Sequence, residues 1–464
     1  MPAPTAPASL PPLAAAPVSA AARLAYVWQH FARAYENAPD LAMLIGLPGS
    51  GAAVEIRDNS AGFFNQILSH PSAPNWREWQ GKNLPFFFDN PAEELILTLE
   101  NGRVFITTDI ISAAFYLLSG WQEYFSSERD RHGRFPYAAS VQKQFGFVTV
   151  PVVNYYFDIL KNAIECATGR TLRPRRWGPA QAPFAAFVSH DVDSLHGGWG
   201  TAARHLLRQR QPLALLRLLA NKLRNRPAPW YNLAHVQAET ARYGASSTFF
   251  VLVENQPAPN GTPNADYAAS APTLQNHLRQ LAAAGAEIGL HGSYGTATNP
   301  ARLAAEAACL PAAPAGNRFH YLAWEPRTTP AVVAAAGFSY DSTLGFAEHF
   351  GFRNSYCLPF FPWDFTSSAA CTFLEIPLTL MDTTLHHPSY LQVESDKFLP
   401  LILPVLEEIK NFGGIFTLLW HNENFDSLNT LNGPGQFHEI MAALLQNKAA
   451  FLGGDEIARA LLEN

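Results

Sequence analysis

One stretch of the sequence decides the fold: Ala185-Ala186-Phe187-Val188-Ser189-His190-Asp191-Val192-Asp193. Its apolar first half is typical of a buried β-strand, and two carboxylates follow at its end. In α/β proteins, ligands bind at this carboxyl edge of the sheet. Alternation along an extended chain places Asp191 and Asp193 on the same side. Two such carboxylates can divide the chemistry, since one can hold a metal ion while the other handles a proton. A helix cap followed by a turn acid is the ordinary alternative for an isolated pair.

The size and composition of the chain favour a folded protein with more than one domain. It has 464 residues, of which 48% are hydrophobic and 15% charged, and its formal net charge is −6. Two domains are expected at this length. No basic block stands out beyond Arg173-Pro174-Arg175-Arg176, so no nucleic-acid partner is predicted. The four cysteines form no C-x-x-C pair, which argues against a zinc ribbon or a redox motif.

The N-terminal segment, residues 1–22, is rich in Ala and Pro and is predicted to be a disordered tail. It lacks the positive n-region of a secretion signal. No uninterrupted apolar run is long enough to span a bilayer. These observations predict a cytoplasmic protein without a membrane span, and they leave its oligomeric state open.

Residues 23–169 show a mixed pattern that predicts an α+β accessory domain. Helix-like segments cover Ala25–Glu36, Ile110–Phe125 and Val150–Ala167, and strand-like segments include Leu41–Leu47. Few of these segments end in His, Asp or Glu, so no chemistry is identified here. Residues 170–183, rich in Pro, Arg and Gly, are predicted to form a linker.

From residue 184 to 464 apolar strand-like segments alternate with Ala- and Leu-rich helical segments, as in parallel βαβ units. About seven such units predict an α/β domain with a distorted or incomplete (β/α) barrel of the TIM type. An open doubly wound sheet is the alternative. The predicted strands are Ala185–Val188, Ser247–Val253, Glu287–Leu290, Phe319–Leu322, Phe338–Asp341, Phe373–Leu380 and Gly414–Leu419.

Residues able to do chemistry follow several of these predicted strands. In a barrel they would meet at one mouth, the active-site face. Scattered core histidines would not coincide with strand ends in this way. The residues are Asp191, Asp193, His291, His320, Asp341, Asp382 and His421. Of these, Asp341 and Asp382 are expected to be helix caps or loop anchors.

Three of these motifs resemble those of the polysaccharide deacetylases, the NodB homology group or carbohydrate esterase family 4. They are Asp191-Val192-Asp193, Glu287-Ile288-Gly289-Leu290-His291 and Leu419-Trp420-His421. The chain is more closely similar to a subgroup whose barrel follows an N-terminal domain of unknown function. In the N-terminal half the resemblance rests on phrases such as His132-Gly133-Arg134-Phe135.

The resemblance implies a metal-dependent hydrolase that removes an N-acetyl or related acyl group from a sugar or polysaccharide. Asp191 would be the general base, Asp193 and His291 would hold the metal, and His421 would be the general acid. A divalent ion, with zinc expected, would activate water and polarise the acyl oxygen. An imidazole can donate a proton near neutral pH.

The chain also departs from the family pattern. Gly295 stands where a second metal-binding histidine is expected, and His320 is the candidate replacement. Ala323 stands where an arginine is expected, and Arg318 or Arg353 could substitute. We expect Arg353, Trp324 and Tyr294 to contact substrate.

These departures leave two alternatives open. The barrel could bind carbohydrate or act as a scaffold without catalysis, or it could hydrolyse a non-sugar C–N bond.

Overall fold

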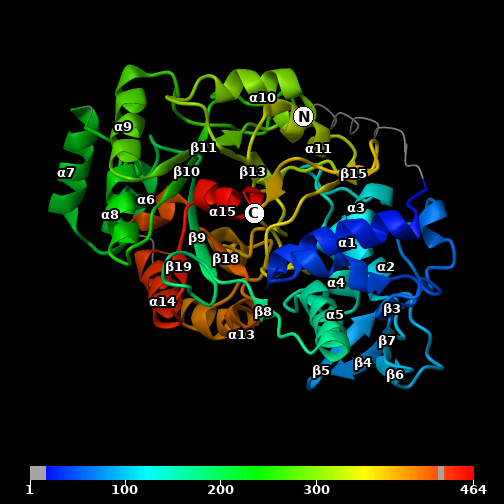
Figure 1. Cartoon of the computed structure of the whole chain (residues 1–464). Coiled ribbons are helices and arrows are strands. Elements are labelled where there is room, and N and C mark those ends of the chain that lie inside the picture. Colours follow the sequence, from blue (N-terminus) through cyan, green and yellow to red (C-terminus); the bar gives the residue numbers. More distant parts are fainter. Residues whose placement is uncertain (1–16, 225, 427–432, 464) are drawn as a thin grey trace.

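The computed structural model describes residues 17–224, 226–426 and 433–463. An N-terminal part of helices and small sheets packs against an α/β part built on a curled parallel sheet (Figure 1). Residues 1–16 of the predicted tail lie outside the described residues. Within the described part, helix α1 (Ala20–Ala34) already begins inside that tail, with Ser19 as N-cap, so the predicted boundary at residue 22 is too late. A serine N-cap is the local signal that marks this start.

The N-terminal part has the α+β character expected from the sequence. Its four-stranded sheet has the order β2-β3-β7-β6, and a separate hairpin pairs β4 with β5. The predicted strand Leu41–Leu47 is mostly wrong, because residues 39–44 form a 3-10 helix. The strands are β1 (Tyr35–Glu36), β2 (Ile45–Gly46), β3 (Val54–Ile56), β4 (Asn75–Trp79), β5 (Lys82–Phe86), β6 (Leu97–Glu100) and β7 (Arg103–Ile106). The further helices are α2 (Ile110–Leu118), α3 (Trp121–Phe125), α4 (Val141–Gln144) and α5 (Val152–Thr168).

The α/β part contains a nine-stranded sheet in which every pairing is parallel. The strands follow one another around the sheet in chain order, and the late strand β18 returns to pair with β9. This confirms the α/β class and the parallel βαβ rhythm. The strands are β9 (Ala185–Val192), β10 (Thr248–Leu252), β11 (Glu287–Gly292), β12 (Gly316–Phe319), β13 (Tyr340–Asp341), β16 (Leu374–Glu375), β17 (Leu380–Met381), β18 (Ile415–Leu419) and β19 (Ala450–Phe451).

The sheet curls toward a barrel at the stretch that joins β16 and β17. β16 pairs with β13, whereas β17 pairs with β18 on the other side. Pro377 lies between the two short strands and has no N–H to donate to a ladder. The predicted distorted or incomplete barrel therefore agrees with a curled sheet whose pairing is interrupted at this stretch.

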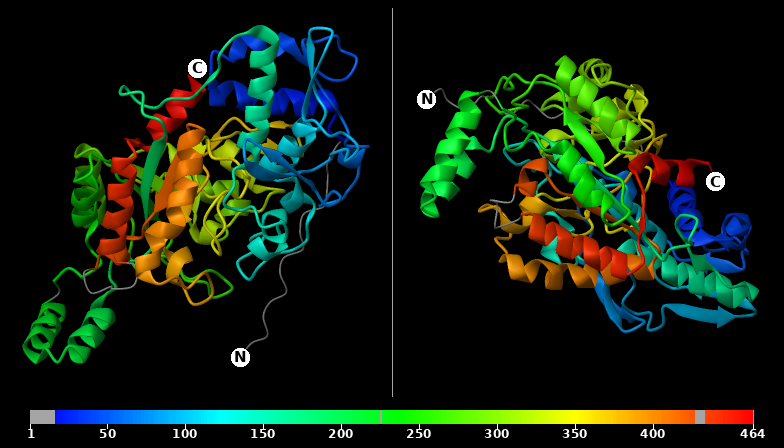
Figure 2. Two further views of the ribbon diagram at one scale, coloured as in Figure 1. Left: turned by 90° about the horizontal axis from the view of Figure 1, so that it is seen from below. Right: turned by 90° about the vertical axis from the view of Figure 1, so that its left-hand side faces the viewer.

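Helices surround the curled sheet on its outer side (Figure 1). Between β9 and β10, two of these helices, α6 and α7, project from the body (Figure 2). The helices are α6 (Trp199–Arg208), α7 (Pro212–Leu223), α8 (Leu233–Ala241), α9 (Pro272–Ala283), α10 (Pro300–Ala307), α11 (Thr329–Ala336), α12 (Asp382–His386), α13 (Phe398–Asn411), α14 (Pro434–Gln446) and α15 (Gly454–Leu462). No helix in the described ranges is long and apolar enough to cross a membrane. The cytoplasmic location stays a prediction.

The two parts share one continuous hydrophobic core. Tyr26 of α1 and Phe115 of α2 each place their ring 5.1 Å from that of Trp363, which lies in the small hairpin of β14 (Trp363–Asp364) and β15 (Ala369–Ala370). The predicted linker, residues 170–183, is ordered and in contact with both parts. It contains β8 (Arg173–Pro174), which pairs with β1, and Trp177, whose indole N–H donates to the Gly413 carbonyl at 2.7 Å.

Candidate active site

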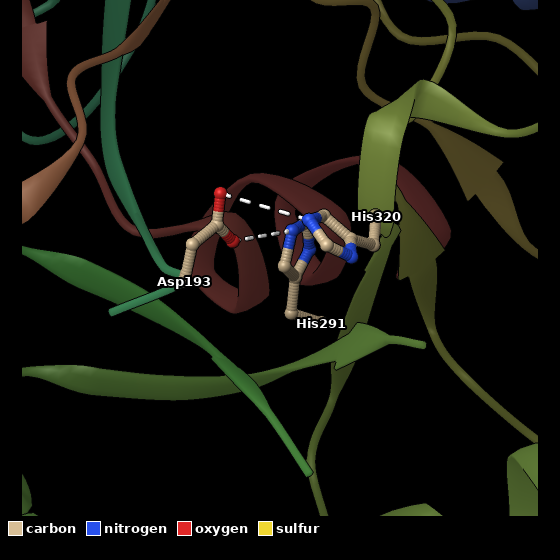
Figure 3. Close-up of side chains that lie close together, drawn as sticks. All are labelled: Asp193, His291 and His320. Atoms are coloured by element: carbon tan, nitrogen blue, oxygen red, sulfur yellow. Dashed lines mark ion pairs between the residues drawn. The ribbon is translucent and has the colours of Figure 1, made fainter. Parts of the chain in front are cut away.

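Three side chains that could bind a metal ion meet at the carboxyl edge of the sheet (Figure 3). Asp193 directly follows β9, His291 lies in β11, and His320 directly follows β12. The Nε2 atom of His291 lies 3.3 Å from Asp193 Oδ1, and the Nε2 atom of His320 lies 3.7 Å from Asp193 Oδ2. One donor atom from each residue lies within 4.8 Å of the others. The structure thus brings together the three residues that were predicted from the sequence as metal ligands.

The hydrogen bonds of these side chains leave donor atoms available for a cation. Asp193 Oδ1 is buried and has no hydrogen-bond partner among the described residues. His291 Nδ1 donates to the Arg318 carbonyl at 2.8 Å, which leaves the lone pair of Nε2 free. One carboxylate and two imidazoles suit zinc or a similar borderline divalent ion. The residues present therefore fit a metal ion.

The protonation of these groups follows from burial and from their mutual charges. Burial lowers the pKa of His320 to about 4, so its imidazole is neutral near pH 7, the form that a metal ligand requires. Burial alone would raise the pKa of Asp193, but the surrounding His320, His291 and His421 imidazoles lower it well below its usual range. Burial lowers the pKa of His291, but Asp191 and Asp193 outweigh it and raise the net value. The Asp193 carboxylate and the His320 imidazole are therefore in the deprotonated and neutral forms that metal ligands require.

The backbone at Gly295 does not suit the second histidine that the sequence resemblance predicts at this position. The backbone of Gly295 has φ +94°, in the left-handed region that residues with a side chain rarely adopt. A histidine would be strained in this loop conformation. The predicted strand Phe319–Leu322 is mostly wrong, because β12 covers Gly316–Phe319 and a 3-10 turn begins at His320. His320 opens this turn and lies next to Asp193.

Asp191, the candidate base, is held by a buried arginine. Arg318 donates from Nη1 to Asp191 Oδ1 at 2.9 Å and to Ser189 Oγ at 2.8 Å. Its Nε donates to the Ser342 carbonyl, so the guanidinium joins β9 to the segment that follows β13. The other oxygen, Asp191 Oδ2, lies 3.6 Å from His291 Nε2. Of the two arginines considered from the sequence, Arg318 therefore contacts the site.

His421, the candidate acid, forms a pair with Asp382. Its Nδ1 donates to Asp382 Oδ1 at 2.7 Å, and its Nε2 lies 3.8 Å from Asp193 Oδ2. Asp382 Oδ2 also accepts from the His421 backbone N–H and from Asn424. Burial lowers the pKa of His421, but Asp382 and then Asp193 and Asp191 outweigh it and raise the net value well above the usual range. The expectation that Asp382 is only a cap or anchor is therefore corrected, since it orients His421. Its place directly after β17 was the sequence signal.

Two of the predicted substrate contacts lie elsewhere. Arg353 is 2% exposed, and its Nε and Nη2 atoms donate to the Glu123 carboxylate at 2.8 and 2.6 Å, so its charge is already paired in the interior. Trp324 is 4% exposed and belongs to the main hydrophobic core, so it offers no open face for a sugar. Both predictions are corrected. Tyr294 is half-buried, and its ring lies 6.2 Å from that of Tyr321, beside the site.

The N-terminal part contributes to this site, which the sequence analysis missed. Tyr321 stacks on His320 with ring centroids 4.0 Å apart, and His132 stacks on Tyr321 at 4.6 Å. Arg134 donates to the Tyr321 carbonyl at 2.9 Å. The phrase His132-Gly133-Arg134 was visible in the sequence, but only the packing shows that it contacts Tyr321, the neighbour of His320. One other histidine and one other acid at strand ends have structural roles. His190 Nδ1 donates to the Trp420 carbonyl, and Asp341 accepts from Asn317 and Thr343.

Comparison with known proteins finds one family model and several solved structures of low sequence identity. A family of unknown function (DUF7033) matches residues 25–168. No curated protein matches the chain. A polysaccharide deacetylase from Mycobacterium smegmatis, described as putative, is 18% identical, covers 62% of this chain and 93% of its own, and has a TM-score of 0.40. A probable polysaccharide deacetylase from Pseudomonas aeruginosa PAO1 is 16% identical over 63% and 94%, with a TM-score of 0.40. The Puue allantoinase is 15% identical over 62% and 93%, with a TM-score of 0.39. The function has to be argued from this chain's own residues.

Proposed function

We propose that this chain is a metal-dependent hydrolase that removes an N-acetyl or related acyl group from a sugar or polysaccharide. One observation carries the proposal: Asp193, His291 and His320 converge between two separately supported groups, Asp191 with Arg318 and His421 with Asp382. A scaffold that only bound carbohydrate would need neither of these two supported pairs. The sugar itself is inferred from the motifs that resemble the polysaccharide deacetylases.

The residues around the site divide the reaction into two proton transfers. A divalent ion held by the three ligands would supply Lewis acidity, which lowers the pKa of water and polarises an acyl oxygen. Asp191 accepts the proton of the attacking water, and Arg318 keeps its carboxylate in position. As the water oxygen bonds to the acyl carbon, the C–N bond breaks.

His421 completes the reaction at the leaving group. Its Nδ1–H is held by Asp382, so Nε2 is the nitrogen that faces the site. Nε2 donates its proton to the departing nitrogen, which leaves as a free amine, while the acyl group leaves as a carboxylate. Tyr294 remains a proposed substrate contact because its ring lies beside Tyr321 at the same edge.

The test combines metal content with product release. We expect about one zinc or similar ion per chain, lost in an Asp193→Ala, His291→Ala double variant, together with acetate release from N-acetylglucosamine oligomers. No metal in either protein after incubation with zinc, manganese or cobalt would contradict the hydrolase and favour the binding-protein alternative. Metal together with cleavage of small amides or cyclic ureides, but not of acetylated sugars, would instead favour the non-sugar hydrolase.

A further inference from the structure

The helical hairpin of α6 and α7 projects from the body of the protein (Figure 2). It is inserted between β9 and α8, and no residue of α7 is buried. α6 packs against α7, so the hairpin is a unit of its own with one helix supporting the other. Helix α7 adds nothing to the core of the barrel, so its sequence is free to serve another purpose.

One face of α7 exposes a row of leucines. Leu213, Leu216, Leu219 and Leu223 are spaced by three, three and four residues, which places them on one side of the helix. Their exposures are 73%, 62%, 46% and 86%, and Leu207 of α6 is 62% exposed. Single exposed leucines are ordinary, but a continuous apolar face on a projecting element marks an interaction surface.

The charge of the hairpin is of one sign. From Ser194 to Ala238 the chain contains no Asp or Glu, whereas the protein as a whole has a net charge of −6. Among the described residues, none forms an ion pair with the hairpin's cations. These cations are Arg204, Arg208, Arg210, Arg217, Lys222, Arg224 and Arg226.

We infer that this hairpin docks the protein onto an anionic lipid surface. Exposed leucines beside unpaired lysines and arginines are the combination that places a helix at the boundary between headgroups and acyl chains. A nucleic acid would neutralise the cations but leave the leucines in water. A second copy docking by the same face would bring two sets of seven positive charges together. An anionic membrane offers acyl chains to the exposed leucines and negatively charged headgroups to the cations.

The root of the hairpin lies next to the candidate acid. Asn422, which follows His421, donates to the carbonyls of Ser194 and Trp230 at 3.0 and 2.9 Å. Asn232 donates back to the Asn422 carbonyl at 2.9 Å. Docking through the hairpin would therefore hold the candidate active site close to the bilayer surface. Only this consequence, a substrate presented at the membrane, rests on the proposed function.

The experiment is vesicle flotation of the full chain. We expect it to float with phosphatidylcholine vesicles containing about one third phosphatidylglycerol, at least tenfold more than with phosphatidylcholine alone, and to be released by high salt. A Leu213→Glu, Leu216→Glu, Leu223→Glu variant should lose at least tenfold of this binding. An Arg217→Gln, Arg224→Gln variant should weaken it.

The matched control is Leu95→Glu, Leu99→Glu, because both leucines are 64% exposed in the N-terminal part. This control should float like the original protein. Equal flotation of the α7 leucine variant, or no preference for the anionic vesicles, would overturn the inference. The inference would also be overturned if light scattering showed a dimer that the α7 leucine variant abolishes and the control variant does not. Metal content and acetate release from soluble oligomers, measured on the same variants, report separately on the proposed function.

Discussion

The candidate metal centre depends on one histidine in an unusual place. His320 begins a turn in which the next two residues, Tyr321 and Leu322, have φ +60° and +55°. This left-handed turn ends β12 and leaves the imidazole beside Asp193. The stack of Tyr321 on His320 then limits the orientations of the ring. The third candidate ligand thus lies at the end of β12, and not at the position of Gly295 where the sequence resemblance predicts a histidine.

Replacement of His320 by Ala tests this assignment. Loss of one of three protein ligands should reduce bound metal from about one ion per chain to less than about a tenth, and activity at least about a hundredfold. Metal content by mass spectrometry and acetate release give the two readouts. His235→Ala, an exposed histidine of α8, is the matched control and should change neither. Full metal content in His320→Ala would show that another group completes the site.

Replacement of Asp382 by Asn tests the orientation of His421. The amide cannot accept the Nδ1 proton and the backbone N–H as the carboxylate does, so His421 loses its fixed tautomer. We expect kcat to fall by about a hundredfold or more, with metal content retained. A variant that lost its metal would place Asp382 in the support of the metal site instead.

At the scale of elements, helix α1 is attached to the α/β part through a neutral histidine. His30 is 1% exposed, its Nδ1 donates to the Tyr26 carbonyl at 2.8 Å, and its Nε2 accepts from the Phe361 backbone N–H at 3.0 Å. The second bond exists only while Nε2 carries no proton. Burial, more than any neighbouring charge, lowers the pKa of His30 from about 6.5 to about 3.

This arrangement predicts a loss of stability in acid. Because the pKa is lower in the folded state, the unfolded chain binds the proton first, and His30 contributes its full stability only above about pH 6.5. Between about pH 6.5 and 3 the free energy of unfolding should fall by up to about 1.4 kcal/mol per pH unit from this group alone. Urea unfolding at several pH values should give a shallower dependence for His30→Gln. An unchanged slope would contradict the role assigned to His30.

At the scale of the whole molecule, a buried ion pair joins the two parts. Glu123 of α3 and Arg353 of the α/β part are 3% and 2% exposed, and the arginine also donates to the Gly345 carbonyl at 3.0 Å. Gln142 of α4 donates to the Arg353 carbonyl at 2.6 Å. The N-terminal part is therefore connected to the barrel by polar contacts as well as by the shared core.

Breaking this pair should destabilise the whole protein. Arg353→Met leaves the Glu123 carboxylate buried without its partner, which costs about 3–5 kcal/mol. The double variant Glu123→Leu, Arg353→Met should lose less than the sum of the two single variants, as measured by urea unfolding. If Arg353→Met instead kept its stability and raised KM, Arg353 would bind substrate as the sequence first suggested.

The sequence by itself determined the features that depend on local pattern. The apolar run of β9 and the alternation of strands with helices established the α/β class, because burial of parallel strands needs continuous apolar segments. His291, His320 and His421 were recognised because they lie within strands or at most two residues after them, and parallel strands bring their carboxyl ends to one edge.

Only the tertiary structure decided which side chains meet across long separations in the chain. It selected Arg318 over Arg353 as the partner of Asp191, and it buried Trp324 in the core. It also brought Arg134 to Tyr321, 187 positions away. These choices depend on how the sheet curls and how the N-terminal part packs. Neither periodicity nor spacing within a segment contains that information, because hydrogen bonds and burial between distant segments arise only when the core is assembled.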